Sequence, residues 1–137
     1  MVWSRHKSQV RLLLDTHVFL WWNEASPKLS RRVRQLLSDP ENSLYLSVVS
    51  AWEMALKVQS GKLRLPAVVS VYIPARLNHY GIEALAVTLD HVLASSALPS
   101  HHRDPFDRIL VAQGQVERLT IVTHDAEVQK YAVDTIW

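Results

Sequence analysis

The stretch Leu12–Trp22, LLLDTHVFLWW, decides the fold, because three leucines lead into an aspartate and an apolar, helix-like stretch follows at once. It predicts a short strand over Leu12–Asp15 and a helix over Val18–Asn23. Burying a carboxylate costs free energy unless a partner compensates for the lost water. Asp15, at the end of an apolar strand, therefore needs hydrogen-bond donors or a cation.

The rest of the chain alternates between strands and helices. Further strands are predicted at Leu44–Ser47, Ile82–Thr88, Leu119–Thr123 and Val133–Trp137. Helices are predicted at Ser30–Ser38, Ser50–Ser60, Pro66–Asn78 with a kink or restart at Pro74, Leu89–Leu98, Asp104–Glu117 and Ala126–Tyr131. This alternation predicts right-handed βαβ units, and hence an α/β fold whose parallel sheet has helices on both faces. Ligands bind such sheets beyond the carboxyl ends of the strands, where the strand order reverses.

The composition indicates one soluble domain. The 137 residues suffice for a single core, which we place at residues 11–137 after an N-terminal extension at 1–10. There is no cysteine, which excludes disulfides, thiolate nucleophiles and cysteine zinc sites and fits a cytoplasmic location. No apolar run is long enough for a membrane span, and no signal peptide is recognised. The net charge of +2 permits a nucleic-acid partner without requiring one.

Each acidic residue near a strand end also has a simpler interpretation as a helix cap. Asp15 and Asp125 each precede a predicted helix, and Asp is a favoured N-cap residue. Glu53 lies three residues after Ser50 in the pattern S-x-x-E, which is a capping box. Asp104 before Pro105 is a strong N-cap signal.

Capping explains Asp107 less well. It lies in the first turn of its predicted helix, where a carboxylate suits the helix dipole, but it shares a face with Leu110 and Val111. An acid on an apolar face needs a partner. Arg108, four residues after Asp104, is placed to pair with that residue instead.

Together, the acids predict a metal site. Asp15, Glu53, Asp107 and Asp125 all fall at strand-to-helix junctions or first helical turns, on one side of the sheet. Clustered carboxylates repel, so they need a proton or a cation. Oxygen ligands suit Mg²⁺ or Mn²⁺. Zinc would need histidines, but the candidates match no zinc spacing; they are His17, His101 and His102.

Four segments resemble the PIN domain, and specifically the D-P-F-D-R subgroup of VapC-type toxins. They are LLLDTHVFLWW, SVVSAWEMALKVQSGKLRLP, HRDPFDRILVAQ and LTIVTHDAEVQKYAVDTIW. The resemblance implies a three-layer α/β/α domain with a five-stranded parallel sheet of order 3-2-1-4-5. It also implies catalytic and metal-binding roles for Asp15, Glu53, Asp107 and Asp125. Asp104, Thr16 and Thr123 match supporting positions near the metal.

The resemblance implies an Mg²⁺- or Mn²⁺-dependent endoribonuclease, the toxin of a type II toxin–antitoxin pair. The partners would be RNA, an antitoxin protein and a second copy in a homodimer. Lys57 and Arg108 are predicted weakly as RNA contacts, the alternative being solvated surface charge. One of Trp21 and Trp22 is expected at a dimer or antitoxin surface, unless both pack in the core. Two alternatives stay open: a nuclease acting on DNA or structured nucleic acid, and a non-catalytic binding module.

Overall fold

The sheet has the order predicted from the sequence. The computed structural model describes residues 9–101 and 104–137, so the first eight residues of the proposed extension, and His102, lie outside the described part. The strands are β1 (Arg11–Leu14), β2 (Ser43–Ser47), β3 (Ile82–Leu85), β4 (Thr120–Val122) and β5 (Thr135–Ile136). All pairings are parallel and the order is β3-β2-β1-β4-β5.

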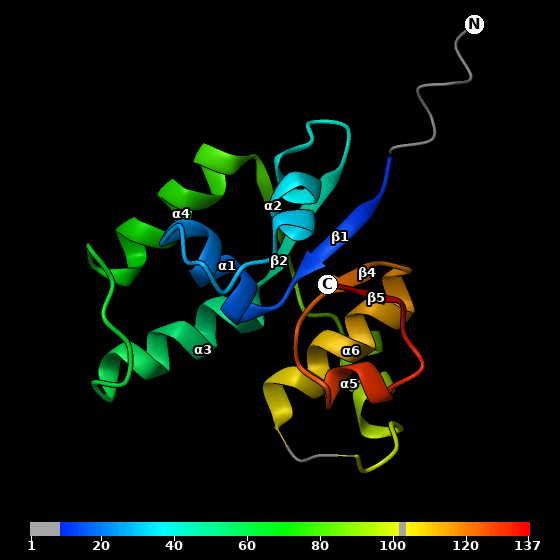
Figure 1. The fold of residues 1–137 in the computed structure, drawn as a ribbon. Helices are drawn as coiled ribbons and strands as arrows, with labels where there is room; N and C mark the ends of the chain where they lie inside the picture. The colour runs from blue at the N-terminus through cyan, green and yellow to red at the C-terminus, as the bar shows by residue number, and fades with distance from the viewer. Residues whose placement is uncertain (1–8, 102–103) are drawn as a thin grey trace, which may run out of the picture.

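Helices cover both faces of this sheet, which gives the three layers (Figure 1). They are α1 (Thr16–Asn23), α2 (Arg31–Ser38), α3 (Val48–Gln59), α4 (Val69–Tyr80), α5 (Leu89–Ser96) and α6 (Pro105–Glu117), with a 3-10 turn, η2 (Val128–Lys130). Figure 1 shows α1, α2 and α4 on one side of β1 and α5 and α6 on the other. Within the described residues, no helix is long and apolar enough to cross a lipid bilayer.

The three leucines of β1 explain the layering. Leu12 and Leu14 pack into one apolar cluster with α1, α2 and α4, whereas Leu13 packs into a second cluster with α6. Successive side chains of a strand point to opposite faces, and all three leucines are fully buried. A strand buried on both faces is typical of a parallel sheet and accounts for the unbroken apolar run.

Two predicted helix starts were wrong. The helix predicted from Ser50 begins at Val48, because the Ser47 hydroxyl accepts from the N–H of Val49. Ser50 is therefore inside α3, and the capping box with Glu53 does not form. The helix predicted from Pro66 begins only at Val69.

One further helix prediction is wrong, and one stays open in part. Pro74 lies inside α4, which does not restart there, while a kink at Pro74 stays a prediction. The helix predicted over 126–131 is only η2, three residues long. Before it, the N–H of Glu127 donates to the Asp125 side chain and the N–H of Gln129 donates to the Asp125 carbonyl, so Asp125 caps a single turn.

Gly114 sets how closely α6 packs on the sheet. A Cβ atom at this position would lie 2.8 Å from Val133 Cγ2 and 3.1 Å from Ile121 Cδ1. The missing side chain therefore lets the middle of α6 rest directly on β4 and the segment before β5. Asp104 and Asp107 lie at the other end of α6.

Candidate active site

The first half of the candidate site forms where β1 lies beside β4, at the point of strand-order reversal. Thr123 Oγ1 donates to Asp15 Oδ2 at 2.7 Å and accepts from the N–H of Asp125 at 3.0 Å. The pairing of the two strands continues through the Asp15 N–H, which donates to the Val122 carbonyl at 3.1 Å. Thr123 therefore ties the two aspartates to the same edge of the sheet.

Asp15 also caps α1. Its Oδ1 accepts from the N–H of His17 at 2.9 Å, so the capping interpretation was correct. It does not exclude a second role, because capping occupies one lone pair of one oxygen. The His17 ring is more distant, with Nδ1 3.8 Å from Asp15 Oδ1, and is well exposed to solvent.

Burial makes Asp15 an unusual carboxylate. The residue is only 6% exposed, and this desolvation raises the pKa of Asp15 above its ordinary value of 3.8. Hydrogen bonds from Thr123 and His17 lower the pKa in part, and the negative charge of Asp125 raises it. A buried carboxylate beside a second carboxylate is better suited to a cation than to water.

The second half of the site is built on α1 and α3. Thr16 Oγ1 lies 2.9 Å from Glu53 Oε1 and 2.8 Å from Ser50 Oγ, and all three residues are buried. A hydroxyl has one proton, so Thr16 donates to the carboxylate and accepts from Ser50. The other oxygen of Glu53, Oε2, lies 3.0 Å from Lys57 Nζ. This carboxylate is thus neutralised by its own helix.

Asp104 and Asp107 lie at the start of α6. Asp104 is the N-cap, as predicted, and its Oδ1 accepts from the N–H groups of Phe106 and Asp107 at 2.9 and 3.3 Å. Asp107 is half-buried in the first helical turn. Asp125 is also half-buried, and its Oδ1 accepts from the N–H of Glu127 at 2.9 Å.

A pocket of about 240 Å³ opens over the first half of the site. It is lined by Asp15, His17, Val18, Trp21, His124 and Asp125. Two hollows of about 530 and 510 Å³ are larger, but none of the four predicted acids lines them. The smaller pocket, which we call the carboxylate pocket, is the candidate active site, because it alone of the three holds two of the predicted metal ligands, Asp15 and Asp125.

The structure brings together part of the predicted ligand set. Asp15 and Asp125 line one pocket, whereas Glu53 is bound to Lys57 and Thr16. Among residues 9–101 and 104–137, no three acidic or histidine side chains are grouped closely enough to hold an ion. Glu53 already has a cation partner in Lys57, so it needs a shared metal less than Asp15 does. The Asp15–Asp125 pair itself fits a divalent cation, since its oxygens are hard ligands and a cation would relieve the desolvation of Asp15.

Histidines line the pocket, and of the three zinc candidates considered above His17 and His101 lie in the described part of the chain. His17 lies at its edge, whereas the exposed His101 packs on Tyr131 with ring centroids 4.8 Å apart. His124, which the sequence analysis did not single out, also lines the pocket. Its position between Thr123 and Asp125 could have predicted this, because the turn that follows a central strand borders the ligand crevice.

The two predicted RNA contacts are already engaged within the protein. Arg108 donates from its Nη atoms to the carbonyls of Ser95, Leu98 and Pro99 at 2.9–3.1 Å, and to the Tyr131 hydroxyl at 3.3 Å. It therefore binds the carboxyl end of α5, and not Asp104 as its i+4 spacing suggested. Lys57 is bound to Glu53. Contacts of either residue with RNA stay predictions.

The two adjacent tryptophans have different environments. Trp22 is 9% exposed and stacks on Tyr80, with ring centroids 3.9 Å apart. Trp21 is half-buried and lines the carboxylate pocket. Core packing is thus confirmed for Trp22, while Trp21 has a surface open to a ligand.

Known structures share this fold. The VapBC2 complex from Rickettsia felis, bound to a promoter DNA fragment, gives a TM-score of 0.66 at 13% identity, covering 93% of this chain and 99% of that one. FitAcB from Neisseria gonorrhoeae gives a TM-score of 0.61 at 20% identity, covering 92% and 96% of the two chains. At such identities the likeness shows the fold alone.

Sequence comparison identifies the family. Ribonuclease VapC22 of Mycobacterium tuberculosis is 25% identical over 88% of this chain and 91% of its own length. Ribonuclease VapC16 of the same organism is 38% identical over 42% of this chain, a match that spans 41% of that relative. The family model described as PIN domain matches residues 12–134. The chain therefore belongs to the PIN domain family.

Proposed function

We propose that this PIN domain is a metal-dependent endoribonuclease and the toxin of a toxin–antitoxin pair. The observation that carries the proposal is the desolvated Asp15, held beside Asp125 by Thr123 at the strand-order reversal. Family membership supports it, as do two relatives named as VapC ribonucleases. Divalent metal ions are typical of PIN ribonucleases; the choice of Mg²⁺ or Mn²⁺ is part of this proposal.

The residues divide the work between holding a metal and positioning its ligands. Asp15 and Asp125 would hold the ion, and Asp107 and Glu53 would complete its ligands. The ion, when bound, supplies Lewis acidity at the phosphate and favours ionisation of the attacking water. Thr123 fixes the orientation of Asp15, and Thr16 fixes Glu53. Asp104 supports Asp107 by capping α6.

An antitoxin and a second copy of the chain are the proposed protein partners. Several solved complexes of this fold are toxin–antitoxin pairs, including VapBC-1 from nontypeable Haemophilus influenzae and a complex from Klebsiella pneumoniae. On this chain Trp52 is 59% exposed and meets the half-buried Phe106 ring edge-on at 5.3 Å. Exposed aromatic rings of this kind are favoured at protein interfaces. Purified chain that stays monomeric at all micromolar concentrations would contradict the homodimer.

The test is cleavage of total RNA by purified chain with Mg²⁺, Mn²⁺ or EDTA. We expect metal-dependent cleavage, reduced by Asp15→Asn by more than roughly 100-fold, since even residues that merely orient metal ligands are worth 10–100-fold. Asp134→Asn is the matched control, because Asp134 is exposed and lies outside the carboxylate pocket. Full activity of correctly folded Asp15→Asn protein would refute the site.

The same assay separates the alternatives. Matched RNA and DNA oligonucleotides, digested in parallel, distinguish a ribonuclease from a nuclease that acts on DNA. Absence of cleavage of both polymers with either metal, by folded and antitoxin-free protein, would favour a non-catalytic binding module.

A further inference from the structure

Four aromatic rings surround the carboxylate pocket. His17 and Trp21 come from α1, His124 follows β4, and Trp137 follows β5. The ring centroids of His17 and Trp21 are 5.8 Å apart, those of Trp21 and Trp137 are 5.9 Å apart, and those of His124 and Trp137 are 4.8 Å apart. We call these four residues the ring cluster. It forms a continuous aromatic border beside Asp15 and Asp125.

The tertiary structure holds the ring cluster in place. The N–H of Thr123 donates to the Ile136 carbonyl at 3.1 Å, which brings Trp137 next to His124. Arg32 Nη1 donates to the Trp137 carbonyl at 3.3 Å. Trp21 packs with part of its surface against the main core. The rings are therefore positioned before any ligand arrives, which lowers the entropy cost of binding.

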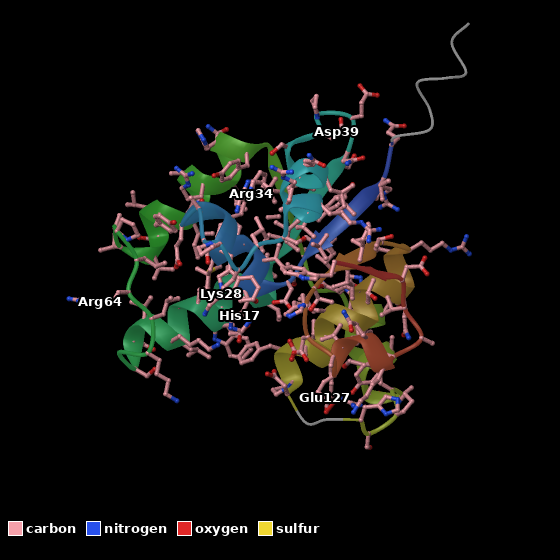
Figure 2. All side chains as sticks on the ribbon, in the orientation of Figure 1. His17, Lys28, Arg34, Asp39, Arg64 and Glu127 are labelled. Carbon is pink, nitrogen blue, oxygen red and sulfur yellow. The ribbon has the colours of Figure 1, made fainter. Side chains whose placement is uncertain are left out.

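The ring cluster does not fill the pocket. His17 retains a side-chain exposure of 59%, and three of the four rings, those of His17, Trp21 and His124, line the 240 Å³ space with the two aspartates. Lys28 Nζ lies 5.9 Å from the centroid of the Trp21 ring. Lys28 and His17 each lie near the Trp21 ring, and Figure 2 labels both in the same part of the view. The pocket thus combines carboxylates, flat aromatic rings and a nearby cation.

This combination matches one part of a nucleic acid. Nucleobases stack on aromatic side chains, and a lysine attracts the phosphate that follows the base. In a duplex the bases are stacked on each other, so their faces are not available to a protein ring. A single strand offers its base faces freely, and stacking on an aromatic ring contributes about 1–3 kcal/mol per base.

We propose that the ring cluster, with Trp21 at its centre, stacks a base of single-stranded RNA next to the phosphate that is cut, and that Lys28 binds a neighbouring phosphate. This inference rests on the proposed function in one respect, namely that RNA reaches the carboxylate pocket. It adds the residues that receive the strand: Trp21 for the face of a base and Lys28 for a neighbouring phosphate. Trp21 is a binding residue in this scheme, and Asp15 and Asp125 remain the metal ligands.

The experiment measures RNA affinity separately from cleavage. Protein carrying Asp15→Asn is titrated into a short fluorescein-labelled single-stranded RNA of mixed sequence, and anisotropy gives Kd. The same strand in a duplex, and a sugar–phosphate chain with abasic residues, are the comparison probes. We expect Trp21→Leu to weaken binding of the single strand by about 5- to 150-fold, the equivalent of about 1–3 kcal/mol. Trp21→Phe, which keeps a ring, should restore most of the affinity.

Two controls separate stacking from packing. Tyr72 is half-buried against the same core as Trp21 but lies on α4, so Tyr72→Leu should leave RNA affinity unchanged. Lys28→Met should weaken binding of all probes, the abasic chain included, and reduce its salt dependence. Thermal unfolding checks that each variant is folded. Trp21→Leu should not alter Kd for the abasic chain, because that chain has no base to stack.

The outcomes distinguish this inference from the proposed function. If the unmodified chain cuts RNA but Trp21→Leu binds single strands as tightly as its parent, the inference fails alone. Equal losses with Trp21→Leu and Tyr72→Leu, or equal losses for abasic and normal strands, would also overturn it. If the unmodified chain cuts no RNA with either metal but Trp21→Leu still loses single-strand affinity, the nuclease fails and the stacking site stands.

Discussion

Asp15 and Glu53 are both buried carboxylates at the same edge of the sheet, but their electrostatic surroundings are opposite. Asp15 accepts from Thr123 and from a backbone N–H, and its nearest carboxylate neighbour, Asp125, is negative. Glu53 accepts from Thr16 and is bound to Lys57. Glu53 is thus paired with a cation of the protein itself, whereas Asp15 can be neutralised by a metal ion from solution.

The contrast shows how the protein can stay folded without a metal although several carboxylates lie close to one site. If all were left like Asp15, mutual repulsion and desolvation would oppose folding. The Lys57 ammonium neutralises the charge of Glu53, which reduces the repulsion among the carboxylates. The same pairing places the Lys57 ammonium beside any metal that Glu53 joins, so the two cations repel.

The largest expected effect is on stabilisation by metal. Mn²⁺ at about 100 times its Kd should raise the free energy of unfolding by about 2.7 kcal/mol, since the ion binds only the folded protein. Asp15→Asn should abolish this gain, whereas Lys57→Met should keep it, because Lys57 opposes the binding of Glu53 to a metal. Urea unfolding with Mn²⁺ or EDTA measures the difference. An undiminished gain in Asp15→Asn would show that the ion binds elsewhere.

An intermediate effect should come from the two threonines. Thr123→Val leaves Asp15 Oδ2 and the Asp125 N–H without these partners, so we expect a loss of about 1–3 kcal/mol in EDTA. Thr16→Val should cost less, about 0.5–1.5 kcal/mol, because Glu53 keeps Lys57. Urea unfolding of both variants tests the order. A larger loss for Thr16→Val would reverse the comparison drawn above.

The smallest expected effect is on the pH dependence of stability. Hydrogen bonds to Asp15 offset part of the rise in its pKa that burial causes. Its folded-state pKa is raised above 3.8, so the folded protein holds this proton to higher pH than the unfolded chain does. The stability that Asp15 contributes is fully present below about pH 3.8, the pKa of this group in the unfolded chain. It is lost as the pH rises through the higher pKa of Asp15 in the folded protein. Metal-free Asp15→Asn should therefore gain stability relative to the unmodified chain as pH rises from 4 to 7. Parallel stability curves for the two proteins would contradict this.

Local patterns in the sequence were sufficient for much of the fold. The apolar run at 12–14, the alternation of strands and helices, and the caps at Asp15 and Asp104 all appear as predicted. Helix boundaries were less predictable, because Ser47 and Ser50 are equally good caps in isolation. Which of them begins α3 depends on where β2 ends, and β2 ends where its pairing with β3 ends, at Ser47.

The sequence by itself determined the strand order, through the family pattern, and which acids lie at strand ends. Only the tertiary structure decided how those acids differ. Thr123 meets Asp15 across 108 residues, and Thr16 meets Glu53 across 37. The ring cluster also joins both ends of the chain, from His17 to Trp137. Burial, and the partner that each carboxylate finds, depend on contacts between strands and helices far apart in sequence, and no local pattern encodes them.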